Sequence, residues 1–512
     1  MLKKWLKICA VVFFLSQKGY GQSKNLETYN YISAGAPNRL LDFDPRKFTT
    51  AHTRYALQLV FENLVKRNYD QELEPGLASN WKINFDNQTL LLNLAKGRMF
   101  SDGTPVTAHA VKSSIEELCS PQSNARLELK NLKGCLSSKK PKINVINDFQ
   151  LKLESNGNPQ VLLYQLSSLR VLIFKESGGK LIGTGPYFVE AKKDQHLVLK
   201  KNPLWNNSKN VANPGIIINF YKLEDEIVQA LKSEKIHVSV NHMIETDSLQ
   251  VLSNYNRIQD QADVTFTLTF NNQRVPFNKK PVRTYIASRI LEEETRIRKC
   301  RAANTKPALG IIPKGIGGSI SHQKNTQEKP PGNLVRLKSP IKITIIQHIG
   351  RKNLCEAQII KSIMDELNIK AEYEYFTDYS LLLDKYAQHD FDAFVELYNI
   401  KNRDAYSVLR YFQSENNKEN LSNISDATLD EFLSEALKSP TAGQRFSWYR
   451  KVVQRIFDNA YVAPLYYTIT SSYYHKCLHG ASHRGSFNPF IELMSMKPSD
   501  SCPVILPPGG QF

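Results

Sequence analysis

The chain has 512 residues, of which 41% are hydrophobic and 23% are charged, and its mean hydropathy is −0.39. These values are near the averages of globular proteins, and the sequence has no uninterrupted apolar run of the length that spans a bilayer. A multispanning membrane protein, a fibre and a disordered scaffold are therefore excluded. The length favours two or three domains. The net charge of +18 is compatible with a polyanionic partner, a membrane surface, an anionic ligand or solubility alone.

The first residues have the order of a secretory signal peptide. Residues 1–21 begin with a basic segment, continue with the apolar block Ile8–Ser16, and end on small residues at Gly21. The apolar block is too short to span a bilayer. We therefore expect a soluble protein that is exported to the periplasm and cleaved near Gly21.

Because an exported protein reaches an oxidising compartment, we interpret its cysteines first as disulfide partners. The cysteines that remain after cleavage are even in number and can pair completely. Proximity along the chain suggests the pairs Cys119 with Cys135 and Cys477 with Cys502, which leaves Cys300 with Cys355. Free buried thiols are the alternative for each pair, because cysteine is also an ordinary small core residue.

Segments with apolar side chains at helical spacing alternate along the chain with segments that have the pattern of strands. Residues 55–66 carry apolar side chains at helical spacing, whereas residues 90–94 and 265–270 have the pattern of strands. The clearest unit is 341–376, where an apolar β-rich run, an amphipathic helix and an alternating segment follow one another. A second helix-to-strand passage covers 379–398. This βαβ pattern predicts an α/β fold with a parallel sheet covered by helices.

The sequence contains few motifs that are typical of catalytic sites. There is no nucleophile-elbow, zinc-protease, phosphate-loop or Cys-x-x-Cys motif. Two Ser-x-x-Lys matches, at Ser137–Lys140 and Ser321–Lys324, lie in Lys-rich segments without the flanking apolar structure that a nucleophile needs. Lys and Arg are dispersed rather than gathered in an aromatic-basic motif. We therefore expect no enzyme, no cofactor and no nucleic-acid partner.

The densest group of metal-ligand residue types is His475, Cys477, His479 and His483. Its spacing matches no closed zinc pattern, and a disulfide at Cys477 removes the thiolate that a metal would need. A solvated loop is the plain interpretation, and the three histidines are weak candidates for a metal site.

A turn that leads into a helix carries the sharpest resemblance to a known family. Residues Phe100–Val111 resemble the Phe-x-Asp-Gly-x-Pro-hydrophobic-Thr-Ala-x-Asp-Val motif of the family 5 extracellular solute-binding proteins, the oligopeptide, dipeptide and nickel binders of bacterial ABC importers. Asp102 and Gly103 are expected to form the turn, and Pro105 to stiffen its exit. Thr107 is expected to cap the helix. We interpret the motif as structural, without contact to ligand.

Other segments match the family in the same order along the chain. They cover nearly all of the mature sequence, so coincidence is implausible although each match alone is weak. The matching segments are 59–64, 75–81, 183–187, 200–205, 231–238, 270–272, 276–277, 282–283 and 462–466.

The resemblance implies a two-lobed periplasmic-binding-protein fold of type II, similar to cluster C, with mixed sheets, helices on both faces and two hinge crossovers. The crossovers are expected at Thr265–Asn271 and Ala463–Thr470. A solute is expected to be enclosed between the lobes by hinge closure and delivered by a monomer to an ABC permease in the inner membrane. The expected divisions are lobe I at 22–265, with a subdomain insertion at about 46–180, lobe II at 266–464, and the return to lobe I with the C-terminal tail at 465–512.

The expected ligand site lies on the segment of lobe II that corresponds to a Trp-x-x-Asp-x-x-Asp-Pro stretch in peptide-binding relatives. Tyr398 takes the place of the aromatic residue, and alignment on Asp404 puts Lys401 where the relatives have the aspartate that pairs with the peptide's amino terminus. Because a cation there repels an ammonium, an anionic group, or a neutral or capped peptide, fits better. The alternative is that Lys401 points to solvent.

Four further residues complete the expected ligand-binding set. Arg403 is expected to bind a carboxylate through two hydrogen bonds. Asp404 is close enough to orient Lys401 or Arg403, and Asn271 and Asn272 lie at the end of the first crossover strand. Two functions from different classes are open. The first is the substrate-binding subunit of an ABC importer that captures a peptide or peptide-like solute, and the second is a binding protein without a transport role that presents ligand to a receptor or acts as an envelope interaction module.

Overall fold

The structure is a computed structural model of the chain. The expected signal peptide lies outside the residues that it describes. Among the described helices, none combines the length and the apolar character needed to cross a membrane. The described residues are 31–37, 40, 42–47, 51–68, 70–137, 140–242, 252–259, 264–301, 305–320, 335–349, 352–377, 379–400, 403–414, 420–469, 471–480 and 489–505.

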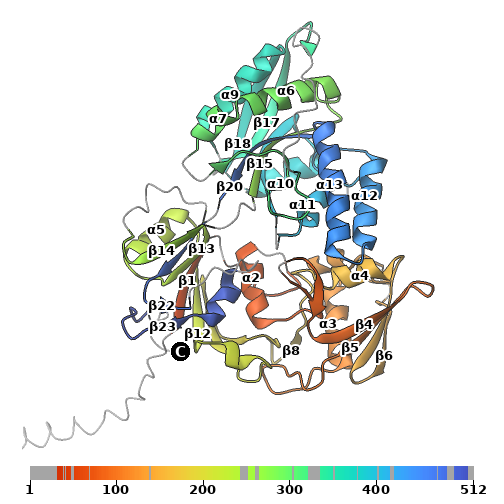
Figure 1. Cartoon of the computed structure of the whole chain (residues 1–512), viewed down its shortest axis with the longest axis vertical. Helices are drawn as coiled ribbons and strands as arrows, with labels where there is room; N and C mark the ends of the chain where they lie inside the picture. The colour runs from red at the N-terminus through yellow and green to blue at the C-terminus, as the bar shows by residue number, and fades with distance from the viewer. Residues whose placement is uncertain are drawn as a thin grey trace, which may run out of the picture.

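Lobe I is built on a mixed sheet in which β1 pairs in parallel with β12 and β13, while the outer pairs are antiparallel (Figure 1). Strand β12 has the sequence GIIINFY and is buried over nearly its whole length, as expected for a strand covered on both faces. The strand order is β10 (Tyr187–Lys193), β11 (His196–Lys201), β12 (Gly215–Tyr221), β1 (Ile32–Pro37), β13 (Val238–His242), β21 (Ser471–His475) and β14 (Tyr255–Gln259). The other elements of this lobe are α2 (Ala51–Val60), η2 (Ser208–Asn210), α5 (Glu224–Lys232), α14 (Pro489–Glu492), η7 (Leu493–Ser495) and the pair β22 (Leu478–His479) with β23 (Lys497–Pro498).

Between α2 and β10 the chain builds a smaller unit, residues 61–182, which we call the insertion. Alternate side chains of its central strand, Leu90, Leu92 and Leu94, are buried in one core with residues of α3 and α4, which is the period of two that a strand requires. Its sheet has the order β4 (Ala78–Asn84), β5 (Thr89–Leu94), β7 (Gln150–Glu154) and β6 (Ile143–Asn147). Its remaining elements are β2 (Val65–Arg67), β3 (Leu73–Pro75), α3 (Ala108–Leu118), η1 (Asn124–Leu129), α4 (Pro159–Gln165), β8 (Lys175–Ser177) and β9 (Lys180–Ile182).

The family motif forms the start of α3, as the sequence predicts. The Oδ1 of Asp102 accepts the backbone N–H of Thr104 at 3.1 Å, and Gly103 has a φ of +85°, a conformation that glycine adopts without steric cost. Thr107 is the N-cap of α3, and its Oγ1 accepts the backbone N–H of Ala110 at 3.3 Å. The motif therefore fixes a turn and a helix start.

Lobe II contains the predicted βαβ unit, because β17 pairs in parallel with both β18 and β19. Ile343 and Ile345 of β17 share a core with α6 and α9, whereas the neighbouring Ile346 packs with α10. Helices on both faces confirm the α/β class. The strand order is β16 (Thr305–Lys306), β20 (Val462–Thr468), β15 (Val264–Phe270), β19 (Ala393–Asn399), β17 (Ile341–His348) and β18 (Ile369–Phe376). The helices are α6 (Lys280–Glu292), α7 (Glu294–Lys299), α9 (Leu354–Glu366), α10 (Tyr379–Gln388), α11 (Tyr406–Leu409), η6 (Arg410–Phe412), α12 (Ala427–Lys438) and α13 (Ala442–Asp458).

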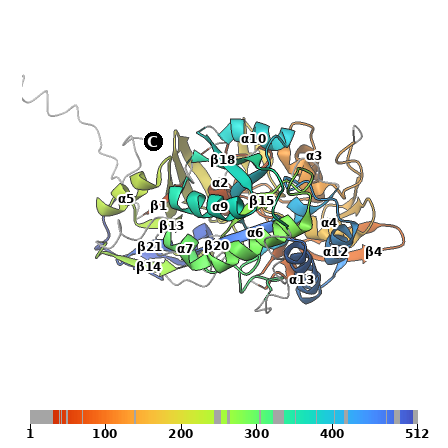
Figure 2. The same cartoon turned by 90° about the horizontal axis from the view of Figure 1, so that it is seen from above.

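The chain passes between the sheets of the two lobes twice, next to β15 and β20, which lie side by side in Figures 1 and 2. The chain leaves the first sheet after Gln259 and enters the second at Val264, then returns between Thr468 and Ser471. Strands β15 and β20 are antiparallel neighbours in which Val264 is the register partner of Thr468. Both connections therefore leave lobe II side by side, which is the geometry of a hinge.

Three disulfides join the cysteines in the pairs that proximity along the chain suggests. They are Cys119 with Cys135 in the insertion, Cys300 with Cys355 in lobe II, and Cys477 with Cys502 in lobe I. Each pair closes a loop within one unit, so each restricts the unfolded chain locally.

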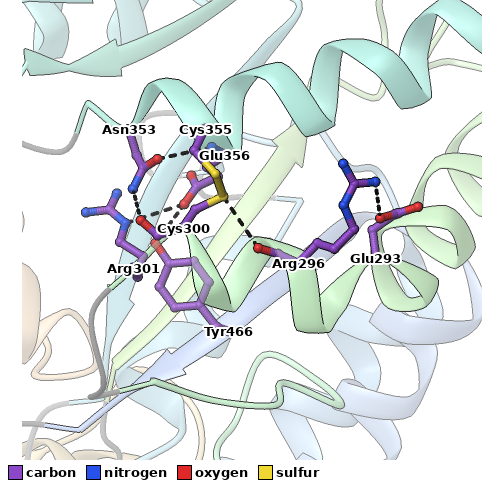
Figure 3. The surroundings of a disulfide bond; sticks show 8 residues. All are labelled: Glu293, Arg296, Cys300, Arg301, Asn353, Cys355, Glu356 and Tyr466. Carbon is purple, nitrogen blue, oxygen red and sulfur yellow. Dashed lines mark hydrogen bonds and ion pairs between the residues drawn. A yellow bond between two sulfur atoms is a disulfide. The ribbon is translucent and has the colours of Figure 1, made fainter.

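The lobe II disulfide, whose Cys355 is exposed, lies beside the buried carboxylate of Glu356 (Figure 3). Cys300 ends α7 and Cys355 lies in the first turn of α9. The neighbouring Glu356 accepts a hydrogen bond from the Tyr466 hydroxyl of β20 at 3.0 Å, and the Nε of Arg301 lies 3.5 Å from the same carboxylate. The disulfide and these contacts together hold α7 and α9 against the strand that leads to the hinge.

Candidate functional site

Tyr398 lies at the end of β19, and only 6% of its surface is exposed. Its ring centroid is 6.1 Å from that of Tyr411 and 5.8 Å from that of Phe412, and its hydroxyl is 3.5 Å from the Oγ1 of Thr269. Burial raises the pKa of Tyr398 to about 12, so the phenol is neutral at physiological pH. This predicted site residue therefore belongs to an aromatic cluster in lobe II.

Asp404 forms an ion pair across the boundary between the insertion and lobe II. Its Oδ2 lies 2.8 Å from the Nη1 of Arg67 on β2, and both side chains are 9% exposed. The same Nη1 donates to the Tyr164 hydroxyl at 2.8 Å, and the guanidinium lies over the Tyr164 ring at 4.8 Å. Burial alone would lower the pKa of Arg67, but Tyr164 and Asp404 outweigh it and raise the pKa. Asp404 thus has Arg67 as an ion-pair partner, which the sequence did not predict. That Asp404 orients Lys401 or Arg403 stays a prediction.

Further contacts at this boundary come from the β2–β3 turn. The Glu72 carboxylate accepts the backbone N–H of Ala442 at 2.9 Å, at the start of α13, and Arg445 of that helix donates to the Gln71 carbonyl. The Arg445 side chain is fully buried. Opening of the hinge has to separate these groups as well as the ion pair.

Arg403 and Lys401 lie between β19 and α11. Arg403 has a φ of +55°, in the left-handed region, and its Nη2 donates to the carbonyl of Gly315 within lobe II. Lys401 lies outside the described residues, so its contact with a solute stays a prediction.

Asn271 and Asn272 make hydrogen bonds within lobe II. The Nδ2 of Asn271 donates to the Phe391 carbonyl at 3.0 Å, and its Oδ1 accepts from Asn423 at 3.1 Å. The Nδ2 of Asn272 donates to the Ser422 carbonyl at 2.9 Å. These contacts fix the loop that follows β15 against neighbouring loops of the same lobe.

The histidine group near the C-terminus lies beside a disulfide. His475 lies within 4.8 Å of the sulfurs of Cys477 and Cys502, but these two cysteines form a disulfide and cannot supply thiolates. The Nδ1 of His475 accepts the backbone N–H of Cys477 at 3.2 Å. His479 lies in the short strand β22, and His483 lies outside the described residues.

Sequence reasoning missed two arginines that approach lobe II. Arg54 lies three residues before Leu57 and seven before Phe61, both of which are buried, so it belongs to the buried face of α2. Had the helical pattern of residues 55–66 been extended by one residue toward the N-terminus, it would have included Arg54. Arg67 had no comparable signal, because its partner is 337 residues away.

Comparison with known proteins identifies the family. The profile of the bacterial extracellular solute-binding proteins, family 5 (middle), matches residues 72–420, which is more than half of the chain. The chain therefore belongs to this family.

Curated relatives and solved structures agree with this assignment. The chain is 24% identical to the probable D,D-dipeptide-binding periplasmic protein DdpA of Escherichia coli, over 82% of this chain and 83% of that protein. It is also 24% identical to the periplasmic oligopeptide-binding protein OppA of Escherichia coli, over 84% and 85%. The structure of the ABC transporter-associated periplasmic binding protein DppA from Helicobacter pylori, in complex with the peptide STSA, superimposes with a TM-score of 0.72 at 17% identity and covers 92% of this chain and 99% of that one.

Proposed function

We propose that this chain is an exported solute receptor that captures a peptide or peptide-like solute between its two lobes and delivers it to the permease of an ABC importer. Family membership supports the binding role. The names of DdpA and OppA, and the peptide in the DppA complex, support a peptide or a compound that resembles one. The signal-peptide pattern of residues 1–21 supports export to the periplasm and cleavage near Gly21.

The observation that carries this proposal is the pair of adjacent connections beside β15 and β20, together with the contacts between the insertion and lobe II. Adjacent connections allow one lobe to rotate against the other about a single axis, and periplasmic binding proteins are the known case of such closure. Closure expels water, so charged and aromatic groups between the lobes act in a lower dielectric.

The lobe II side of the site is proposed to come from residues 398–404. Tyr398 covers the apolar part of the solute from its aromatic cluster, and Lys401 takes the place of the aspartate that relatives use for a peptide amine. We expect Lys401→Asp to weaken binding of the native solute by more than tenfold, on the order of 2 kcal/mol, and to admit peptides with a free amino terminus. Unchanged affinity for the solute that co-purifies with the protein would remove Lys401 from the site.

Small-angle scattering of the mature protein tests the proposal directly. The protein is measured alone and with the solute that native mass spectrometry detects in material purified from its own host. We expect the radius of gyration to fall when the solute is added and to return after dialysis. A solute that binds without compaction would instead identify a rigid binding module without a transport cycle.

A further inference from the structure

Arg54, in the first turn of α2, is a buried cation. Only 5% of the surface of Arg54 is exposed. Its Nε has no hydrogen-bond partner, and its guanidinium has no ion pair within the described part of the chain. A buried charge is strongly unfavourable unless a counter-charge compensates it. Arg54 therefore needs an anion that these residues do not supply.

Groups of the insertion and of lobe II act electrostatically on Arg54 of α2. The electrostatic environment of its guanidinium includes Tyr411 of lobe II, and Arg170 and Glu128 of the insertion. Glu128 is already shared by two other guanidinium groups, because its Oε1 lies 3.5 Å from the Nη1 of Arg410 and 3.9 Å from the Nη1 of Arg170. This carboxylate therefore cannot serve as a dedicated partner for Arg54.

The charge states on α2 follow from burial. Burial, followed by repulsion from Arg170, lowers the pKa of Arg54 to about 10, so the guanidinium is still a cation at physiological pH. Burial, followed by repulsion from Arg54, lowers the pKa of His52 to about 4, so this imidazole is neutral at the same pH. The side of α2 that approaches lobe II thus presents one charged group, Arg54.

We propose that Arg54 binds a carboxylate group of the solute, at the junction of α2 with the insertion and with η6 of lobe II. The inference rests on the proposed function, because it takes the solute to be enclosed between the lobes. A guanidinium donates two parallel hydrogen bonds to a carboxylate. Arg170 and Arg410, which meet at Glu128, add positive potential to the junction.

The aromatic side chains beside this junction favour a carboxylate that is attached to an apolar body. The Arg410 guanidinium lies 5.5 Å from the centroid of the Tyr411 ring, which in turn packs against Tyr398. Aromatic rings contribute large apolar contact area at fixed geometry. A peptide or acylated amino acid with a free carboxylate matches an arginine next to such rings better than inorganic phosphate does.

Calorimetric titration of the mature chain tests this inference with three probes, namely N-acetyltrialanine, N-acetyltrialanine amide and inorganic phosphate. Arg54→Met removes the guanidinium and keeps an unbranched apolar side chain. Arg296→Met is the matched control, because it changes the net charge equally at a residue of α7 whose side chain is 68% exposed. We expect the wild type and the control to bind N-acetyltrialanine about tenfold more tightly than its amide, and Arg54→Met to lose this difference.

Native mass spectrometry of host-purified wild type and variants supplies the second readout. We expect the retained solute to contain a carboxylate, and its occupancy to fall about tenfold in Arg54→Met and to stay unchanged in Arg296→Met. Peptide binding that does not depend on Arg54 would overturn the inference and leave the proposed function intact. Arg54-dependent binding of a carboxylate solute that is not a peptide would overturn the proposed function and leave the inference intact. Arg54-dependent binding of phosphate alone would overturn the carboxylate assignment, and a protein that binds no probe and retains no solute would overturn both proposals.

Discussion

Arg67 and Arg54 approach lobe II at two places, and both are buried. Arg67 has a carboxylate at 2.8 Å, a hydroxyl at 2.8 Å and an aromatic face at 4.8 Å, and its pKa is raised. Arg54 has none of these partners among the described residues, and its pKa is lowered to about 10. The same residue type in similar burial thus has opposite electrostatic surroundings.

The difference separates a structural cation from a cation that needs a ligand. The pair of Arg67 with Asp404 is complete within the chain, so its function is to hold the insertion against lobe II. Arg54 remains charged while Glu128 is engaged by other arginines. An uncompensated buried charge costs stability, and this cost is explained if an anion binds at Arg54 in the working state of the protein.

The largest effect is expected when the complete pair is broken. Arg67→Met leaves the Asp404 carboxylate buried without its cation, so we expect the free energy of unfolding to fall by about 3 to 5 kcal/mol. Urea unfolding followed by circular dichroism measures this change. Adding Asp404→Asn to Arg67→Met removes the uncompensated charge and is expected to restore part of the loss. A loss below about 1 kcal/mol would mean that the pair behaves as an exposed ion pair.

The disulfide of the insertion is expected to have the next largest effect. Cys119 and Cys135 are separated by 16 residues, and closing a loop of this length stabilises a protein by about 3 kcal/mol. The double substitution Cys119→Ala and Cys135→Ala should destabilise the insertion, which carries Arg67, by about this amount in urea unfolding. Non-reducing peptide mapping of exported protein is the companion measurement, and free thiols at both positions would contradict the pairing.

Arg54→Met is expected to act in the opposite direction from Arg67→Met. Replacing an uncompensated buried ion by an apolar side chain is expected to raise the free energy of unfolding of the solute-free protein by about 2 kcal/mol. Thermal unfolding of extensively dialysed protein measures the gain, with Arg296→Met as the control that should change little. Destabilisation by Arg54→Met would show that the protein itself compensates this charge.

The smallest effect concerns acid stability near α2. The folded-state pKa of His52 is about 4, against an ordinary value of 6.5, so the unfolded state binds more protons between these two values. The contribution of neutral His52 to stability is therefore fully present above pH 6.5. The free energy of unfolding is expected to fall by about 1 kcal/mol for each pH unit as the pH drops toward 4. His52→Gln should reduce this slope in urea unfolding at several pH values, whereas an unchanged slope would assign it to other groups.

Local sequence patterns were sufficient for much of the fold. The Phe100–Val111 motif predicted a helix cap at Thr107, and the apolar periods of residues 341–376 predicted the βαβ unit; both are present. The strand patterns at 265–270 and 463–470 were recognised as well. The strands observed there, Val264–Phe270 and Val462–Thr468, belong to the lobe II sheet, and the connections beside them join the lobes. Such features depend on residues close together in sequence, where spacing alone sets the geometry.

The sequence by itself determined the family, the α/β class and the neighbouring cysteine pairs, because each rests on a local motif, a period or a short separation. Only the tertiary structure decided which charges meet. Asp404 was predicted to orient Lys401 or Arg403, both close to it in sequence. Its ion pair with Arg67, 337 residues away, was not predictable, because it depends on the packing of the insertion on lobe II. Likewise, whether Arg54 is compensated depends on which acids surround it after folding, and no spacing in the sequence encodes that.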